Sequence, residues 1–371
     1  MPKSNPPFRA DIVGSFLRPD SLIDARRAFN GDLSVVKSDA RKPDSLVAIE
    51  DQAIRDLVKL QEDLGLEVVT DGEFRRLYYF DLLAAFEGVD IVKEEGINFV
   101  SGFSPPRVVV RDKVRWPEGG VTVSDFRFLK SLTTRTPKIT LPSPLFSQFY
   151  NKDRIDRSVY PDLDAFWADI ITAYRKELLA LAKDGCSYVQ IDETTLIRLC
   201  DPKFVEILRE NGIDPNAELN RWAGILNAIT SDMPDDLTIG MHICRGNGPG
   251  GSWISSGSYD AIADAIFNHI AVDSYLLEFD SERAGGFEPL RFLPKGKGVV
   301  LGLVTTKSPK LETQSEIKRR VEEATRYVPL ESLALSPQCG FSSDSIDRPI
   351  DYDGQRQKME LVVKTASEIW R

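Results

Sequence analysis

Residues 237–247 read Leu-Thr-Ile-Gly-Met-His-Ile-Cys-Arg-Gly-Asn. The apolar run at the start of this stretch predicts a buried strand over 237–243. Because side chains alternate between the two faces of a strand, His242 and Cys244 point the same way. An imidazole and a thiol at the mouth of a strand are half of a tetrahedral zinc site, although a buried cysteine beside a hydrogen-bonded histidine also fits this pair. The rest of the chain has to distinguish these two interpretations.

Seven other short apolar runs resemble this strand, and amphipathic stretches such as 51–64 and 162–183 lie between them. The eight predicted strands are 12–16, 67–70, 138–141, 188–192, 237–243, 275–279, 299–304 and 333–336. Apolar strands that alternate with helices indicate an α/β protein with a parallel sheet, and eight repeats favour a (β/α)₈ TIM barrel. A doubly wound open sheet is the alternative, which the lack of a G-x-G-x-x-G motif after the first strand weakens.

The 371 residues are expected to form a single barrel domain, 1–371, with one insertion. The insertion, residues 88–137, contains Val108-Val109-Val110, a Pro117-Glu118-Gly119-Gly120 turn and Val121-Thr122-Val123. A turn between two β-branched runs predicts a β-hairpin inserted after the second strand. The hairpin is interpreted either as a lid over the active site or as a passive insertion.

The charge, the apolar runs and the cysteine count of the chain limit the kinds of partner and location that we expect. A net charge of −10 and a pI of about 5.0 argue against binding to nucleic acid or to an anionic membrane surface. No run approaches the length of a membrane span, and the first residues lack the apolar region of a secretory signal. Four cysteines do not form a disulfide framework, which favours reduced thiols and a cytoplasmic location. The oligomeric state is not predicted.

Polar residues follow the predicted strands at the rim where barrel enzymes have their active sites. Among them, Glu278 and Cys339 complete a four-coordinate set with His242 and Cys244, and this set predicts a Zn²⁺ site. A salt bridge from Glu278 to Arg283 and a core position for Cys339 are the competing interpretations. Two thiolates and one carboxylate would leave the zinc electron-rich, which favours activation of a substrate thiol over hydrolysis.

The chain resembles the catalytic barrel of cobalamin-independent methionine synthase. The resemblance runs from Val13-Gly14-Ser15-Phe16 to Cys339-Gly340-Phe341 and rests on short motifs in a specific order. It implies that the zinc ligands are the four residues above and that the substrate thiol is homocysteine. It also implies that Glu73 and Asp192 hold the amino group of homocysteine, while the turn at Gly14 and Ser15 contacts its carboxylate.

The residues expected to act on the methyl donor differ from the pattern of this family. The two-barrel methionine synthases are longer, and Lys307-Ser308-Pro309 stands where they have a histidine before Ser-Pro. Methyl transfer from a tertiary amine requires a protonated nitrogen, so Lys307 is the candidate catalytic acid or the charge that orients an anionic donor. A solvent-exposed lysine is the alternative. Methyltetrahydrofolate and a methylated corrinoid protein are both open as donors.

The sequence therefore predicts a zinc-dependent methyltransferase that converts homocysteine to methionine. A related thiol alkyltransferase, such as an epoxyalkane–coenzyme M transferase, is the second hypothesis. It is disfavoured because a sulfonate would need cations where Glu73 and Asp192 stand. The third hypothesis is a non-catalytic barrel that binds zinc or another ligand, which the cost of gathering charged groups at one rim argues against.

Overall fold

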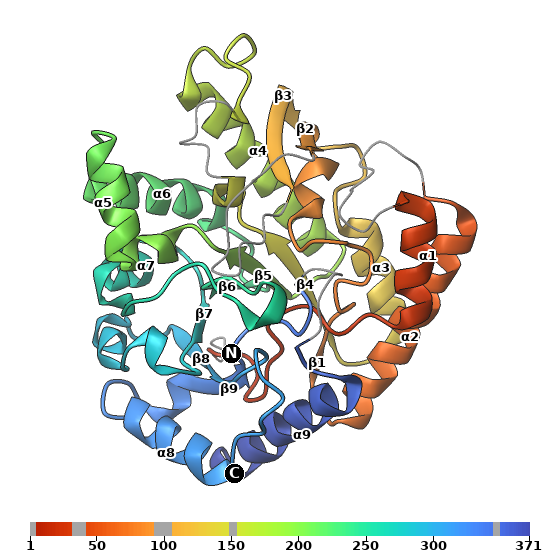
Figure 1. Ribbon diagram of the computed structural model, residues 1–371, viewed down its shortest axis with the longest axis vertical. Coiled ribbons are helices and arrows are strands. Elements are labelled where there is room, and N and C mark those ends of the chain that lie inside the picture. The colour runs from red at the N-terminus through yellow and green to blue at the C-terminus, as the bar shows by residue number, and fades with distance from the viewer. Residues whose placement is uncertain (1–4, 32–41, 93–105, 148–153, 344–348) are drawn as a thin grey trace.

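The computed structural model describes residues 5–31, 42–92, 106–147, 154–343 and 349–371. Within these residues, seven parallel strands form one curled sheet, and helices surround it (Figure 1). The strands, in their spatial order, are β1 (Val68–Val69), β4 (Thr136–Pro142), β5 (Tyr188–Glu193), β6 (Thr238–Ile243), β7 (Ser274–Glu278), β8 (Gly298–Val304) and β9 (Leu333–Pro337). This arrangement is consistent with a TIM-like barrel.

The apolar runs become strands because both faces of the sheet are covered. Every residue of β5, β6, β7 and β8 is buried. A strand buried on both faces reads as a nearly continuous apolar run, which is the pattern that predicted these elements. The predicted α/β fold with a parallel sheet is confirmed, and the runs from 138–141 to 333–336 coincide with β4 to β9. Because the strands are parallel, their carboxyl ends meet at one rim.

The helices that cover the sheet begin at residues suited to helix starts. Asp214 caps the helix that Pro215 opens, and Thr313 and Glu316 form a capping box at the start of another. The helices in the described parts of the chain are α1 (Asp20–Asn30), α2 (Asp44–Asp63), α3 (Val123–Leu132), α4 (Leu163–Lys183), α5 (Pro202–Glu210), α6 (Pro215–Thr230), α7 (Ala263–His269), α8 (Gln314–Ala324) and α9 (Tyr352–Ile369).

Residues 12–16, the first predicted strand, do not form a strand, so this prediction is wrong. Ala10 forms an isolated parallel bridge with Leu335 of β9, and the Phe16 amide donates to the carbonyl of Gly72 just beyond β1. Between these two points, side chains replace a neighbouring strand as partners of the backbone. Lys138 donates to the carbonyl of Ile12, and the Gln190 amide donates to that of Val13. The segment therefore lies between β9 and the end of β1 without strand geometry.

The predicted hairpin is also wrong in its pairing. Residues 108–110 belong to β3 (Arg107–Arg115), which pairs antiparallel with β2 (Glu87–Val92) and not with residues 121–123. The Glu177 carboxylate of α4 accepts hydrogen bonds from the backbone amides of Val121 and Thr122 at 2.8 and 2.7 Å, and α3 begins at the next residue. These amides are therefore not available to a strand. Residues 93–105 of the expected insertion lie outside the described residues, and the lid role stays a prediction.

Candidate metal centre and active site

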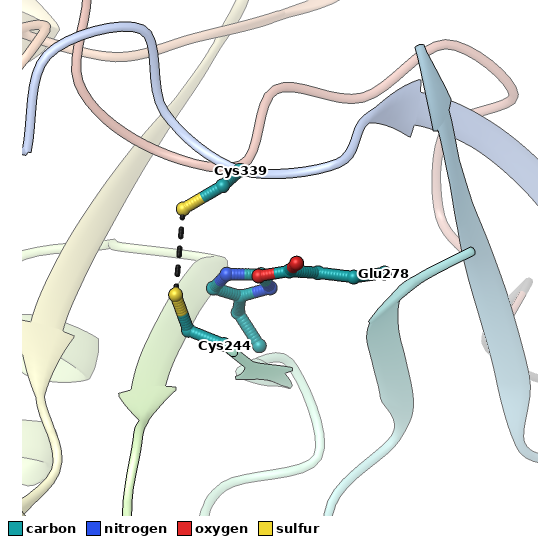
Figure 2. A group of neighbouring side chains, drawn as sticks. Cys244, Glu278 and Cys339 are labelled. Carbon is teal, nitrogen blue, oxygen red and sulfur yellow. Dashed lines mark hydrogen bonds between the residues drawn. The ribbon is translucent and has the colours of Figure 1, made fainter. Parts of the chain in front are cut away.

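Four potential metal ligands meet at the carboxyl-terminal rim of the sheet. His242 lies in β6 and Cys244 directly follows it, Glu278 is the last residue of β7, and Cys339 follows β9. Their ligand atoms all lie within 4.8 Å of one another, and all four residues are buried. Figure 2 shows the side chains of Cys244, Glu278 and Cys339 converging from three separate segments. Two sulfurs, one imidazole nitrogen and one carboxylate oxygen match the donor types of tetrahedral zinc sites.

A backbone carbonyl on the neighbouring strand fixes the orientation of the His242 imidazole. Its Nδ1 lies 3.0 Å from the carbonyl oxygen of Leu276 on the neighbouring strand, and because a carbonyl only accepts, Nδ1 carries the proton. The buried Nε2 has no hydrogen-bond partner within the described residues. An outer partner that fixes the ring and leaves the other nitrogen unpaired is typical of histidine ligands. Burial opposes a charge on this ring, but Cys339, then Asp192 and Glu278, raise the pKa of His242 to about 9.

The Glu278 carboxylate keeps its charge although it is fully buried. Its Oε1 accepts from the Arg245 amide at 2.8 Å, and its Oε2 accepts from Arg283 Nη2 at 2.7 Å. Burial opposes ionisation, but Arg283, followed by Lys307 and His242, holds the pKa of Glu278 below its ordinary value. The salt bridge that competed with ligation in the sequence interpretation is present. Both carboxylate oxygens thus accept a hydrogen bond, Oε2 from Arg283 and Oε1 from the backbone, and the carboxylate still lies within 4.8 Å of the other three candidate ligands.

The two cysteines form a closely spaced pair. Their Sγ atoms lie 3.5 Å apart (Figure 2), and the Gly246 amide donates to Cys244 Sγ at 3.3 Å. The hydrogen bond from the Cys244 thiol holds the pKa of Cys339 well below its ordinary value, and the same bond, together with burial, raises that of Cys244 well above it. Zinc–sulfur bonds of about 2.3 Å in a tetrahedron place two sulfurs about 3.8 Å apart. The pair therefore fits a metal that displaces the shared proton.

Two buried carboxyl groups lie on the β1 and β5 side of the site. Glu73 is 3 % exposed, and its Oε2 has no hydrogen-bond partner within the described residues, although Arg76 Nη1 lies 3.8 Å away. Its backbone has φ of 61°, a left-handed conformation that non-glycine residues adopt at a cost and mainly at functional sites. Asp192 accepts from Gln190 Nε2 at 2.6 Å, and burial, followed by the charge of Glu73, raises the pKa of Asp192 to about 7. Two such carboxyl groups suit a cationic group of a ligand.

The predicted turn at Gly14 and Ser15 lies between these acids and the Cys339 segment. A Cβ on Gly14 would lie 3.0 Å from Glu73 Oε1, so the absence of a side chain permits the close approach. The Ser15 hydroxyl accepts from the Ser342 amide at 3.1 Å, and the Ser15 carbonyl accepts from the Phe341 amide at 2.7 Å. The hydroxyl of Ser15 thus accepts a hydrogen bond within the protein, and its O–H group can still donate.

Lys307 points to the loop after β6. Its Nζ donates to the carbonyl oxygen of Gly246 at 2.8 Å, to Asn247 Oδ1 at 2.9 Å and to the carbonyl oxygen of Ser252 at 3.2 Å. The side chain is partly buried, so the alternative of a lysine in solvent does not describe it. Sequence reasoning did not single out Asn247 as a functional residue. The stretch quoted at the outset ends on it, but its contacts depend on the β8 and β9 loops.

Comparisons with known proteins place this site in a family. Residues 12–352 match the model of the family described as "Cobalamin-independent synthase, Catalytic domain". The chain belongs to this family. The predicted resemblance to cobalamin-independent methionine synthases is therefore confirmed, as is the predicted class of enzyme, a methyltransferase of that type.

Across the described residues, no helix has both the length and the apolar character needed to cross a membrane.

Three similar proteins illustrate the family. The chain is 38% identical to "Uncharacterized protein YxjH" of Bacillus subtilis, over 98% of this chain and 95% of that protein. It is 26% identical to a protein of Pyrococcus abyssi named "Methionine synthase", over 97% of this chain and 92% of that protein. Among solved structures, a putative vitamin-B12 independent methionine synthase from Listeria monocytogenes is 30% identical, with a TM-score of 0.75 and 98% of both chains covered.

Proposed function

We propose that this family member is a zinc-dependent methyltransferase that methylates the sulfur of homocysteine to give methionine. The observation that carries the proposal is the buried group of His242, Cys244, Glu278 and Cys339, with its ligand atoms within 4.8 Å of one another. When bound there, zinc would lower the pKa of a substrate thiol, so that the sulfur is a nucleophile at neutral pH. The sulfur then takes the methyl group from the donor, and the donor keeps the electron pair of the broken bond.

The residues of the chain supply substrate recognition. We propose that Glu73 and Asp192 bind the ammonium group of homocysteine, because both carboxyl groups are buried and Oε2 of Glu73 has no hydrogen-bond partner in the described part of the chain. The turn at Gly14 and Ser15 would contact the substrate carboxylate, because the Ser15 hydroxyl accepts from the Ser342 amide and its O–H group can still donate. An amino acid thiol is thereby oriented with its sulfur toward the metal ligands.

The donor side of the proposal rests on Lys307. Its ammonium group would protonate the donor nitrogen of a methylated folate or would orient an anionic donor. Proton donation requires Lys307 to exchange one of its contacts with Gly246, Asn247 or Ser252 for the donor. A methylated corrinoid protein as donor would not require this acid.

An assay with purified protein tests the proposal. The protein is loaded with zinc and incubated with homocysteine and either methyltetrahydrofolate, its polyglutamate form or a methylated corrinoid protein, and methionine is measured by mass spectrometry. Formation of methionine with one of these donors, and its loss in the Cys339→Ala variant, is the expected result. Zinc-loaded protein that forms no methionine from any of them would contradict the proposal.

A comparison of homocysteine with coenzyme M tests the second hypothesis, that the protein is a related thiol alkyltransferase. In cobalt-substituted protein, only the true thiol substrate is expected to change the thiolate-to-cobalt absorption. We expect homocysteine to change it and coenzyme M to leave it unchanged, because Glu73 and Asp192 repel a sulfonate. The reverse result would favour the thiol alkyltransferase.

A further inference from the structure

The two cysteine-bearing loops are joined by a chain of hydrogen bonds that starts at Lys307. An ammonium group has three N–H donors, and Lys307 Nζ has three acceptors on residues 246, 247 and 252 of the loop after β6. Lys307 itself follows β8, which ends at Val304. The lysine therefore ties the β8 loop to the segment that carries Cys244.

Asn247 extends this connection to the segment that carries Cys339. Its Oδ1 accepts from Lys307, while its Nδ2 donates to the carbonyl oxygen of Gly340 at 2.8 Å and to Ser343 Oγ at 3.0 Å. The same Gly340 carbonyl accepts from Thr306 Oγ1 at 2.9 Å. One amide side chain thus bonds the β8 loop and the β9 loop at once.

The Gly246 turn transmits this arrangement to the sulfur of Cys244. Gly246 has φ of 98°, and a Cβ there would lie 2.8 Å from the backbone nitrogen of Ile254, so the turn requires glycine. Its amide donates to Cys244 Sγ at 3.3 Å, and its carbonyl oxygen accepts from Lys307 at 2.8 Å. Displacement of this turn would move the amide that contacts the sulfur.

We propose that Lys307 and Asn247 are positioning residues that hold the loops of Cys244 and Cys339 at the sulfur–sulfur spacing that zinc needs, and that they thereby set the zinc affinity of the site. The inference rests on the proposed function, because it takes the four-residue group as the zinc site. The observed spacing of 3.5 Å is close to the tetrahedral value of about 3.8 Å. Neither residue contacts the metal in this proposal, and each acts through the ligand loops.

Metal affinity distinguishes this role from proton donation. Loss of a direct outer partner of a metal ligand typically weakens binding about 10–100-fold, and Lys307 and Asn247 act one contact further out, so we expect Asn247→Ala and Lys307→Met to raise the zinc dissociation constant by the lower end of that range, about tenfold. The constant is measured by competition with a chromophoric chelator. Lys310→Met is the matched control, because Lys310 lies in the same loop and is exposed. Asn247→Ala removes no charge, so a weaker zinc affinity in that variant would result from a change in the placement of the two loops and not from a lost charge.

Thermal melting of each metal-free variant shows whether it folds. If Lys307→Met does not fold, Asn247→Ala decides the question. Folded variants that bind zinc as tightly as the Lys310→Met control would overturn the positioning role. Wild-type protein without zinc affinity would overturn the proposed metal site itself. Tight zinc binding by wild type, weakened in Asn247→Ala, would support the positioning role even if no methionine were formed in the activity assay.

Discussion

The two ends of the curled sheet hold buried charged clusters that differ in how their polar atoms are paired. The cluster near the strand beginnings, here the core triad, consists of Asp11, Lys138 and Tyr188. Lys138 Nζ lies 2.8 Å from Asp11 Oδ1, and the Tyr188 hydroxyl donates to Asp11 Oδ2 at 2.7 Å. The charged side chains of Lys138 and Asp11 are both 0% exposed. Burial outweighs the opposite charge of Asp11 and lowers the pKa of Lys138 from its ordinary value.

The cluster at the strand ends is arranged differently. In the metal group His242, Cys244, Glu278 and Cys339, the imidazole Nε2 has no hydrogen-bond partner among the described residues, and the two sulfurs face each other at 3.5 Å. A buried imidazole nitrogen without a hydrogen-bond partner is costly, and together with two sulfurs and a carboxylate it offers the donor types of a zinc site. The strand beginnings thus hold an ion pair closed within the protein, whereas the strand ends gather side chains that could hold a metal ion.

The largest expected effect is on the core triad. Lys138→Met leaves the Asp11 carboxylate buried without its counter-charge, and breaking a buried ion pair in this way costs about 3–5 kcal/mol. We expect the free energy of unfolding in urea to fall by about that amount. The double variant Lys138→Met with Asp11→Asn should recover part of the loss, because no charge then stays buried. A loss below about 1 kcal/mol in the single variant would mean that the triad is not a stability element.

The next effect concerns the metal group. Removal of one of four ligands by Cys339→Ala is expected to cost about a quarter of the binding energy of a zinc site of this kind, or about 3 kcal/mol, which is roughly a hundredfold in affinity. Zinc is quantified by elemental analysis after dialysis against a weak chelator. Cys200→Ala is the control, because Cys200 is a buried thiol outside the group. Full retention of zinc by Cys339→Ala would contradict the assignment of the ligands.

The smallest effect is a pH dependence on the acidic side of the site. Burial and the charge of Glu73 raise the pKa of Asp192 to about 7, so its carboxyl group is ionised above that pH and loses its charge as the pH falls through it. The ammonium group of methionine stays protonated over this range. We therefore expect methionine to bind the metal-free protein about tenfold more weakly at pH 6 than at pH 8, measured by calorimetry.

The control for this prediction is Asp192→Asn. This variant has no titrating carboxyl group at position 192, so its methionine affinity should be weak and nearly constant between these pH values. His242, with a pKa of about 9, stays charged over the same range and does not contribute to the slope. An unchanged slope in Asp192→Asn would assign the titration to another group.

Patterns in the sequence were sufficient to predict much of the sheet and to select four side chains that the structure brings together at one rim. The strands β4 to β9 were predictable because strands buried on both faces are continuous apolar runs. Alternation along the predicted strand 237–243 and the residue after it placed His242 and Cys244 on one face, and the parallel arrangement brought Glu278 to the same rim.

The errors have one physical origin, which is that side chains distant in the sequence bind backbone groups. Residues 12–16 have the composition of a strand, but Lys138 and Gln190 bind their carbonyl groups. Residues 121–123 have the composition of the second half of a hairpin, but Glu177 binds the amides of Val121 and Thr122. No local pattern contains these partners, because each lies more than fifty residues away along the chain.

By itself the sequence determined the alternation of strands and helices and the pairing of His242 with Cys244 at the end of one predicted strand, because both are properties of residues close together in the chain. Only the tertiary structure decided which atoms stay unpaired and which loops are joined. Cys244 and Cys339 are 95 positions apart, and Lys307 reaches Asn247 across 60 positions. Such distances close only when the sheet curls, and this closure brings the imidazole of His242 and the thiol of Cys244 together with a second thiol and a carboxylate.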